Sequence, residues 1–373
     1  MPSVDLAPII PDYFGPNVRG IIPALLGPGD WSRSLPSWFP EPVRHASQVV
    51  VLIVDGLGWD QFVEHRALTP SLAAMTGGAI TTVAPTTTAT ALASIATGLT
   101  PGEHGLVGYR MSVRGEVLNV LRWAAGDSDR RRAMPPTQVQ PFAPFLGLAV
   151  PVISPAELER SAFTEAHLRG SRPVGYRAPS AIAVEVRRQL GAGERFVYAY
   201  YGSVDKTAHE RGFGEYYDAE LQMADHLVAT VLDVLPPGAV LLVTADHGQV
   251  EVGDRVLVPD PAVMAMVATQ SGEGRFRWWH VDRASVDELA KAAIDAYGDV
   301  AWIVTREQVL DEQWFGPTVS GPVAARLGDV AVVAREAVSF HDPLDAGAFP
   351  LVCRHGSLTS AEVRVPLLAS AGA

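Results

Sequence analysis

Three aspartates stand at the ends of three strongly apolar runs of the sequence. Asp55 follows VVVLIV, Asp205 follows FVYAYYGSV, and Asp246 follows VLLVTA. Continuous apolar runs of this length are typical of strands in a parallel sheet that is covered on both faces. Ligands bind at the carboxyl ends of strands in an open α/β sheet, so we expect the three carboxylates to share one edge. Their mutual repulsion at close range requires a positive charge that offsets it.

Three histidines stand in contexts that favour metal binding. In DKTAH, His209 follows Asp205 by four residues, which places both side chains on one face if a helix begins there. In DHG, His247 directly follows Asp246, and His355 lies in the segment CRHGS. Carboxylates and imidazoles in equal number suit a pair of divalent cations, zinc first and manganese second.

A row of threonines, residues 86–88, precedes the small-residue segment ATALASIA. Tandem threonines can cap a helix, or they can present a hydroxyl for chemistry. A threonine hydroxyl is a weak nucleophile at neutral pH, and coordination to a divalent cation lowers its pKa and fixes its direction. In the following GEHG, both a turn-stabilising hydrogen bond and direct chemistry are open for His104.

The elements that must position these residues alternate between strands and helices. The apolar runs predict strands within residues 48–58, 195–205 and 239–248. Residues 216–235 place their apolar side chains mainly along one helical stripe, and residues 284–298 predict a second helix with a glycine stop. Strands that alternate with helices predict an α/β fold with a doubly wound sheet.

Two segments interrupt this alternation. Residues 110–191 are polar and rich in proline, and residues 255–315 contain GEGRFRWWHVD. Both are longer than the loops of a compact domain, so we expect them to have structure of their own and to cover the sheet edge as caps or lids. The sequence therefore predicts a single catalytic domain over residues 1–373 with two insertions.

The composition excludes several classes of protein. The net charge of -12 argues against a nucleic-acid scaffold, although metals can supply the positive charge that phosphates need. A single cysteine, Cys353, excludes an internal disulfide and fits a reducing compartment. The chain shows neither a secretory signal nor an apolar run of membrane-spanning length. We therefore expect a cytoplasmic protein with a small-molecule substrate and no membrane partner, and we make no prediction of its oligomeric state.

Together, these motifs resemble the alkaline phosphatase superfamily, and most closely its type I phosphodiesterase and nucleotide pyrophosphatase branch. The matching segments are VLIVDGLGWD, PTTTATALASIATGLTPGEHG, GSVDKTAH, TADHGQ and CRHGSLTSAEVRVPLL, in the family's order from about residue 48 to 368. The last segment also resembles the closing part of phosphonoacetate hydrolases and cofactor-independent phosphoglycerate mutases. The resemblance implies a three-layer α/β/α core with a mainly parallel central sheet.

The resemblance also implies two divalent metal ions near the carboxyl edge of the sheet. The ligands that it implies for one ion are Asp205, His209 and His355. The ligands that it implies for the other ion are Asp55, Asp246 and His247. The nucleophile maps to Thr88, whose hydroxyl bridges toward the second ion. A helix that begins at Thr88 would direct its backbone N–H groups and its positive dipole end at phosphoryl oxygens.

The residues that bind the substrate depart from the family pattern. Nucleotide pyrophosphatases carry an asparagine after the nucleophile that contacts a phosphoryl oxygen, but no asparagine lies between Thr88 and residue 110 here. The candidates for this contact are Tyr109, Arg110 and Asn119. Monoesterases of the superfamily bind the two free phosphate oxygens with an arginine, because a guanidinium is bidentate. The candidates for that role are Arg110, Arg122 and the run of arginines at 130–132.

The residues and the resemblance predict a metal-dependent phosphoryl hydrolase of the phosphodiesterase and nucleotide pyrophosphatase type. Its course would be phosphoryl transfer to Thr88 followed by attack of a metal-bound hydroxide. A phosphomonoesterase, phosphonate hydrolase or phosphomutase of the same superfamily is the alternative. A non-catalytic protein that binds a phosphate ligand is a third possibility, against which the complete ligand set argues, because clustered buried carboxylates are costly without ions.

Overall fold

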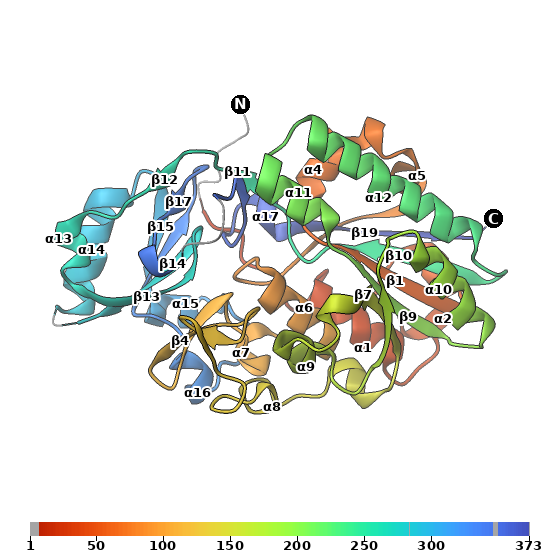
Figure 1. Cartoon of the computed structure of the whole chain (residues 1–373), viewed down its shortest axis with the longest axis horizontal. Helices are drawn as coiled ribbons and strands as arrows, with labels where there is room; N and C mark the ends of the chain where they lie inside the picture. Colours follow the sequence, from red (N-terminus) through yellow and green to blue (C-terminus); the bar gives the residue numbers. More distant parts are fainter. Residues whose placement is uncertain (1–6, 283, 346–349, 373) are drawn as a thin grey trace.

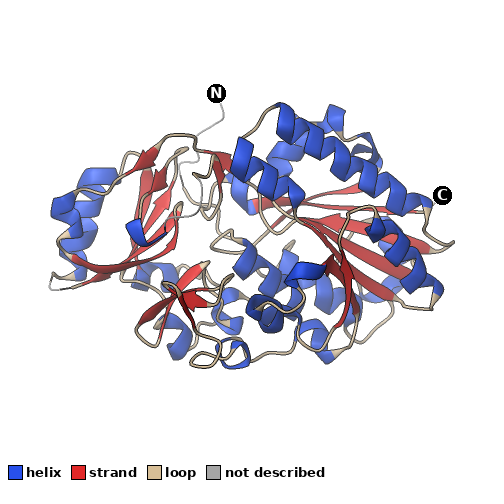
Figure 2. Ribbon diagram, viewed as in Figure 1, coloured by secondary structure: helices blue, strands red, loops and turns tan. Residues whose placement is uncertain are grey.

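A seven-stranded sheet forms the centre of the computed structural model, which describes residues 7–282, 284–345 and 350–372 (Figures 1 and 2). Its strands are β1 (Gln48–Val54), β2 (Thr76–Thr81), β7 (Pro151–Pro155), β8 (Arg172–Tyr176), β9 (Phe196–Tyr201), β10 (Ala239–Thr244) and β19 (Arg364–Ala371). Their order is β2-β19-β10-β1-β9-β7-β8. The run from β10 to β8 is parallel throughout, and β19 is antiparallel to both of its neighbours.

The three apolar runs of the sequence form the middle of this sheet. β1 pairs in parallel with β10 on one side and with β9 on the other. Almost every residue of these three strands is buried, which explains why their sequences do not alternate between apolar and polar residues. The prediction of an α/β fold with a mainly parallel central sheet is confirmed.

Helices cover both faces of the sheet (Figure 1). One layer contains α4 (Trp59–Glu64), α5 (Pro70–Ala74), α11 (Ser203–Arg211) and α12 (Glu215–Asp233). The opposite layer contains α1 (Ile21–Leu26), α6 (Thr88–Thr97), α7 (Pro101–His104) and α9 (Ala162–Leu168). The predicted helix at 216–235 is α12, and its buried stripe includes Leu221, Val228 and Val231. No helix in these described ranges is long and apolar enough to cross a membrane.

A second, antiparallel sheet lies beside the carboxyl edge of the central one, on the left of Figure 1. It consists of β13 (Val267–Glu273), β14 (Phe276–Val281), β16 (Val330–Ala334) and β15 (Ala301–Thr305), in this order. The predicted helix at 284–298 is α14 (Val286–Tyr297), which packs on β15 and β16 over a separate apolar core. We call this unit, residues 255–340, the cap.

A third sheet lies below the cap in Figure 1. It is formed by β3 (Arg110–Val113), β4 (Glu116–Asn119), β5 (Ala124–Ala125) and β6 (Ser128–Asp129). Of the segment 110–191, only this first part forms a sheet of its own. Residues 151–191 instead supply β7, β8 and α10 (Ala181–Gly191) to the central layers, because β7 pairs in parallel with β9. A role of either predicted insertion as a lid stays a prediction.

The remaining elements are short. Two two-stranded sheets pair β11 (Val250–Glu251) with β18 (Cys353–Arg354) and β12 (Val256–Leu257) with β17 (Ser339–Phe340). The short α-helices are α2 (Trp31–Ser34), α3 (Glu41–Arg44), α8 (Pro136–Val139), α13 (Pro261–Met264), α15 (Arg306–Asp311), α16 (Gly321–Ala324) and α17 (Ser360–Val363). The 3₁₀ turns are Val18–Gly20, Arg66–Leu68, Pro144–Gly147, Ala156–Leu158 and Pro343–Asp345.

A fully buried ion pair joins the cap to the central domain. Arg275, between β13 and β14, donates from Nε and Nη2 to the two carboxylate oxygens of Glu362 in α17, each at 2.8 Å. Glu362 also accepts from the N–H of Ser357 and the hydroxyl of Thr359. A bidentate guanidinium–carboxylate pair with its remaining lone pairs satisfied is stable in the interior, but either partner alone is not.

We expect Glu362→Gln to lower the free energy of unfolding by about 3–5 kcal/mol, because it leaves the Arg275 charge buried and unpaired. The measurement is the midpoint of denaturant unfolding at an unchanged slope. The control is Glu185→Gln, which breaks an exposed pair with Arg188 and should cost less than about 1 kcal/mol. Equal losses in the two variants would show that the buried pair does not hold the cap in place.

Candidate active site

Two of the predicted metal-binding aspartates are brought together by strand register. Asp55 directly follows β1, and Asp246 stands two residues beyond β10, which pairs with β1 in parallel. His247 Nε2 lies 3.5 Å from Asp55 Oδ1 and 3.4 Å from Asp246 Oδ2. The hydroxyl oxygen of Thr88 lies 3.1 Å from the same His247 nitrogen. The structure therefore assembles these four side chains around one point, which we call the first cluster.

The helix α6 begins at Thr88, as the sequence predicted. The preceding Thr87 has extended backbone and stands at the N-cap position, although its side chain makes no capping hydrogen bond. Every residue of α6 after Thr88 is buried, and its small side chains allow this close packing. Thr88 is thus presented by the first turn of a helix, where free backbone N–H groups favour an anion.

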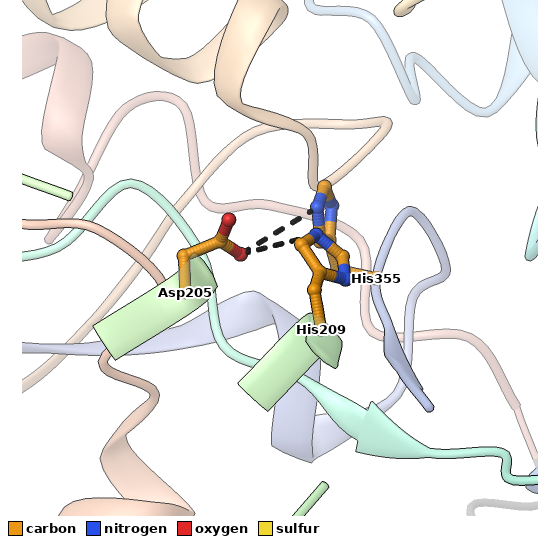
Figure 3. A group of neighbouring side chains, drawn as sticks. All are labelled: Asp205, His209 and His355. Atoms are coloured by element: carbon orange, nitrogen blue, oxygen red, sulfur yellow. Dashed lines mark ion pairs between the residues drawn. The ribbon is translucent and has the colours of Figure 1, made fainter. Parts of the chain in front are cut away.

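The second cluster consists of Asp205, His209 and His355 (Figure 3). Asp205 lies in the first turn of α11, and His209 follows it by one helical turn with its Nε2 3.3 Å from Asp205 Oδ1. His355 follows β18 and approaches the same oxygen to 3.9 Å. Asp205 also lies within reach of Asp55 and His247, so one carboxylate is shared by the two clusters.

Close approach of two chain segments is needed to bring Asp205 beside the first cluster. The N–H of Asp205 donates to the backbone carbonyl of Asp55 at 3.1 Å. Gly56 has φ of +73°, and a Cβ atom there would lie 2.9 Å from the Cα atom of Asp205. Only glycine meets both conditions, because other residues are strained at this φ and would collide with Asp205.

All three histidines are held in the same tautomer by backbone carbonyls. The Nδ1 atoms of His209, His247 and His355 lie 2.7–3.1 Å from the carbonyl oxygens of Cys353, Gly248 and Thr86, respectively. A carbonyl can only accept, so each Nδ1 carries the hydrogen and each Nε2 keeps its lone pair. Each Nε2 faces a carboxylate. This arrangement is typical of metal-ligating histidines, whose other nitrogen donates to a backbone or carboxylate oxygen.

The electrostatics of the clusters fit bound cations. Asp55 Oδ1 and Asp246 Oδ2 are buried without a hydrogen-bond partner among the described residues. Burial raises the pKa of both carboxyls, and for Asp55 the charges of Asp246 and Asp205 raise it further. Burial also holds the pKa of His355 well below its usual range, and His247 and His209 lower it further. A divalent cation at the first cluster would be ligated by two carboxylate oxygens that otherwise have no hydrogen-bond partner among the described residues, and one at the second cluster by Asp205 and the Nε2 atoms of two histidines.

A cavity of about 360 Å³ opens beside the clusters. Its lining includes Thr88, Asp205, His209 and His355 of the clusters. The remaining lining residues are Thr87, Tyr109, Leu121, Arg122, Glu273, Gly274, Asp345, Leu351 and Arg354. We call this remaining set the cap wall, although only Glu273 and Gly274 belong to the cap itself. A volume in this range suits a small-molecule ligand.

The structure separates the three residues predicted to contact the substrate. Tyr109 lines the cavity. Asn119 is not among the residues that line it, and instead donates from its amide to the Tyr109 hydroxyl at 2.8 Å. Arg110 points away into a buried ion-pair network with Asp342 and Asp345, because its guanidinium is the counter-ion that these carboxylates require. Of the other arginines considered for phosphate binding, Arg122 lines the cavity, and those at 130–132 are not among its lining residues.

Several site residues could not be recognised in the sequence. Glu273 and Arg354 lie in segments that the sequence singles out, but nothing in those segments assigns these two residues to the site, and they meet only in the folded cavity. Tyr200 donates its hydroxyl hydrogen to Asp55. Thr86 does more than support a loop: its hydroxyl donates to the Ser357 carbonyl and accepts from the Gly356 N–H. The only signal for Thr86 was its place in the threonine row.

His104 lies outside the cavity wall and stabilises a turn. It is buried, its Nδ1 accepts from the N–H of Leu106 at 3.1 Å, and its Nε2 lies 2.8 Å from the Ser94 hydroxyl. The sequence left two roles open for His104, a turn-stabilising hydrogen bond and direct chemistry. The structure shows the hydrogen bonds.

Comparison with known proteins adds a family and a fold. A family model described as type I phosphodiesterase / nucleotide pyrophosphatase matches residues 49–357. No curated protein sequence matches the chain. Murine ectonucleotide pyrophosphatase / phosphodiesterase 5 has a similar structure, with a TM-score of 0.65 and 16% identity over 87% of this chain and 88% of that one.

Two further structures are similar in fold. One is an inactive variant of the same murine protein, with alanine in place of a threonine, in complex with AMP (TM-score 0.65, 16% identity, 88% of each chain). The other is phosphonoacetate hydrolase from Sinorhizobium meliloti 1021 in complex with phosphonoacetate (TM-score 0.63, 15% identity, 87% of this chain and 90% of that one). The resemblance to this branch of the alkaline phosphatase superfamily is confirmed.

We expect Asp205→Asn to weaken binding of Zn²⁺ or Mn²⁺ at least about tenfold at both clusters, because Asp205 is the shared carboxylate and even outer-shell partners are worth 10- to 100-fold. The measurement is calorimetric titration together with metal content after dialysis. The control is Asp233→Asn at an exposed position of α12. Loss of one equivalent only would show that the two clusters do not share Asp205.

A second expectation concerns pH. Burial raises the pKa of Glu273 from 4.5 to about 7, so between these values the folded protein keeps a proton that the unfolded chain releases. The contribution of Glu273 to the stability of the metal-free protein should therefore fall as pH rises from 5 to 7. Glu273→Gln removes this penalty and should be more stable than the wild type by about 3 kcal/mol above pH 7, but not below pH 4.5. Denaturant unfolding across pH 5–8 measures the difference, and a constant difference would contradict the expectation.

Proposed function

Because this chain belongs to the type I phosphodiesterase / nucleotide pyrophosphatase family and is a hydrolase of phosphate ester or phosphoanhydride bonds, we propose that it cleaves its substrate with Thr88 as nucleophile and two divalent metal ions as cofactors. The observation that carries this proposal is the position of the Thr88 hydroxyl. It stands at the first residue of α6, at the cavity, and 3.1 Å from the Nε2 atom of His247.

Two displacements account for hydrolysis. In the first, Thr88 Oγ1 forms a bond to phosphorus while the bond from phosphorus to the leaving oxygen breaks. The Thr88 proton passes to water, and the leaving oxygen takes a proton from water. In the second, a water molecule attacks the phosphothreonine, the bond to Thr88 breaks, and the threonine hydroxyl is restored. The first turn of α6 offers N–H groups to the phosphoryl oxygens in both steps.

The first cluster, with Thr88, and the second cluster would each hold one metal ion. When bound, such ions lower the pKa of a coordinated hydroxyl and stabilise negative charge on the phosphoryl group. The mixed nitrogen and oxygen donors favour zinc, with manganese as the second choice. The backbone carbonyls that fix the three Nδ1–H groups keep the ligand nitrogens directed at the clusters before any ion arrives.

The substrate that we propose is a phosphodiester or a nucleotide-type pyrophosphate. The similar murine structure that contains AMP, in a variant inactivated by replacing threonine with alanine, supports both the substrate class and the role of a threonine. Tyr109 takes the place at the cavity that an asparagine has in the family, because its hydroxyl already accepts from Asn119 and its own hydrogen is free for a phosphoryl oxygen. The single cysteine favours a cytoplasmic location.

A phosphonate hydrolase or monoesterase is the second candidate. The similarity to a structure of phosphonoacetate hydrolase and the presence of Arg122 at the cavity favour it, since a guanidinium can bind two free phosphate oxygens. Relative rates on bis-p-nitrophenyl phosphate and p-nitrophenyl phosphate separate the two candidates. A diesterase cleaves the first compound faster, and a monoesterase the second.

We expect Thr88→Ala to lower kcat for bis-p-nitrophenyl phosphate at least about 10³-fold, because the nucleophile is lost while the other groups remain. Metal content should change little, since the aspartates and histidines of both clusters remain. Thr88→Ser keeps a hydroxyl and should keep measurable turnover. A Thr88→Ala enzyme at the wild-type rate would refute the threonine mechanism.

A further inference from the structure

Arg354 is a cation without a carboxylate partner at the cavity. Its side chain is half-buried on the cap wall, one residue before His355. Among the described residues, no carboxylate lies within 4.0 Å of its guanidinium, and its Nε is buried without a hydrogen-bond partner. The two fully buried arginines of the nearby cap do have such partners: Arg275 pairs with Glu362, and Arg277 with Asp345.

The surrounding charges do not neutralise Arg354. The charge of Asp345 acts on it from a distance, but this carboxylate is already paired with Arg277 at 3.1 Å and with Arg110 at 3.7 Å. Glu273 on the same wall carries only part of a negative charge at neutral pH, because burial raises its pKa to about 7. Arg122 adds a second guanidinium to the wall, and it too has no ion pair in the described part of the chain.

The backbone leaves room for this guanidinium. A Cβ atom at Gly274 would lie 3.0 Å from Nη1 of Arg354 and 2.3 Å from the hydroxyl oxygen of Ser339. The absence of a side chain at the turn between β13 and β14 therefore creates the space that Arg354 occupies. The pairing of β18 with β11, in which Arg354 stands opposite Val250, holds the start of its side chain.

The two metal clusters supply no negative charge that could pair with Arg354 and Arg122. Two divalent cations against the carboxylates of Asp55, Asp205 and Asp246 leave about one positive charge, which the reacting phosphoryl group of a diester neutralises. Arg354, which is half-buried, and Arg122, which is exposed, then line the cavity without an ion-pair partner among the described residues. A buried or half-buried cation is stable only when something anionic pairs with it.

We propose that Arg354, assisted by Arg122, forms an anion subsite on the cap wall that binds a second negatively charged group of the substrate, either another phosphoryl group or a carboxylate. This inference rests on the proposed phosphoryl hydrolysis. It adds that the enzyme prefers a substrate with an anionic group beside the phosphoryl group that reacts. The planar guanidinium suits both groups, because each presents two oxygens to it.

The test uses the metal-loaded enzyme with bis-p-nitrophenyl phosphate, which has a single negative charge, as the reporter. Inhibition constants are measured for inorganic phosphate, pyrophosphate and phosphonoacetate. We expect Arg354→Gln to raise the constants of pyrophosphate, phosphonoacetate or both by about 10- to 100-fold, the range of a lost charge-assisted hydrogen bond. The kcat and KM of the reporter are measured for every variant, and the exposed Arg364→Gln should leave them unchanged.

The variants and outcomes distinguish the alternatives. A loss for pyrophosphate alone identifies a second phosphoryl group, and a loss for phosphonoacetate alone identifies a carboxylate. Arg354→Lys should restore part of the binding, Arg122→Gln should give a smaller loss without disturbing the buried structure, and the exposed Arg364→Gln should change nothing. Unchanged inhibition constants in both Arg354→Gln and Arg122→Gln would overturn the subsite.

Failure of the proposed function has a different signature. A wild-type enzyme that does not hydrolyse the reporter in Zn²⁺ or Mn²⁺ contradicts the phosphodiesterase proposal, not the subsite. In that case calorimetric binding of pyrophosphate and phosphonoacetate to the metal-loaded wild type and Arg354→Gln tests the subsite without turnover. Equal affinities for both proteins would overturn it.

Discussion

The clustering of three carboxylates at one edge of the sheet, two of them fully buried, is the constraint on which the rest of the structure depends. Asp55, Asp205 and Asp246 repel one another, and burial raises the pKa of two of them. A protein can retain such a group only if cations compensate it. The carbonyl contacts that expose the Nε2 atoms of three histidines, and the glycine that admits Asp205, follow from the need to build a site for those cations.

Segments from opposite ends of the chain must meet to complete this site, and their contacts are mainly buried hydrogen bonds. Thr86 donates to the Ser357 carbonyl, accepts from the Gly356 N–H and accepts the Nδ1–H of His355 at its own carbonyl, which joins the segment of the proposed nucleophile to a proposed metal ligand. Glu362, a few residues later, pairs with Arg275 of the cap. The same closing segment therefore orients a metal ligand and holds the wall that faces it.

The residues that line the cavity come from different parts of the fold. In the proposed mechanism, Thr88 and the two clusters act on the reacting phosphoryl group, and they lie within the part of the chain that the family model matches. The cap wall, with Tyr109, Arg122, Glu273 and Arg354, is proposed to contact what is attached to that group. The cap is not independent of the central layers, because Phe276 and Trp278 pack into the main core while Trp279 packs into the smaller core beside α14.

The sequence by itself determined the α/β class, the three central strands and the start of α6, which follow from local patterns: apolar runs and a threonine row before a small-residue segment. The resemblance to the family implied the seven site residues, and the structure brings them close together, while their roles stay predictions. Only the tertiary structure decided that Arg110 is an internal counter-ion, that Asn119 supports Tyr109, and that residues 151–191 belong to the central layers. It alone brought Glu273 and Arg354 to the cavity, because a side chain's ion-pair partner and its access to a cavity depend on contacts between distant segments, which no local pattern encodes.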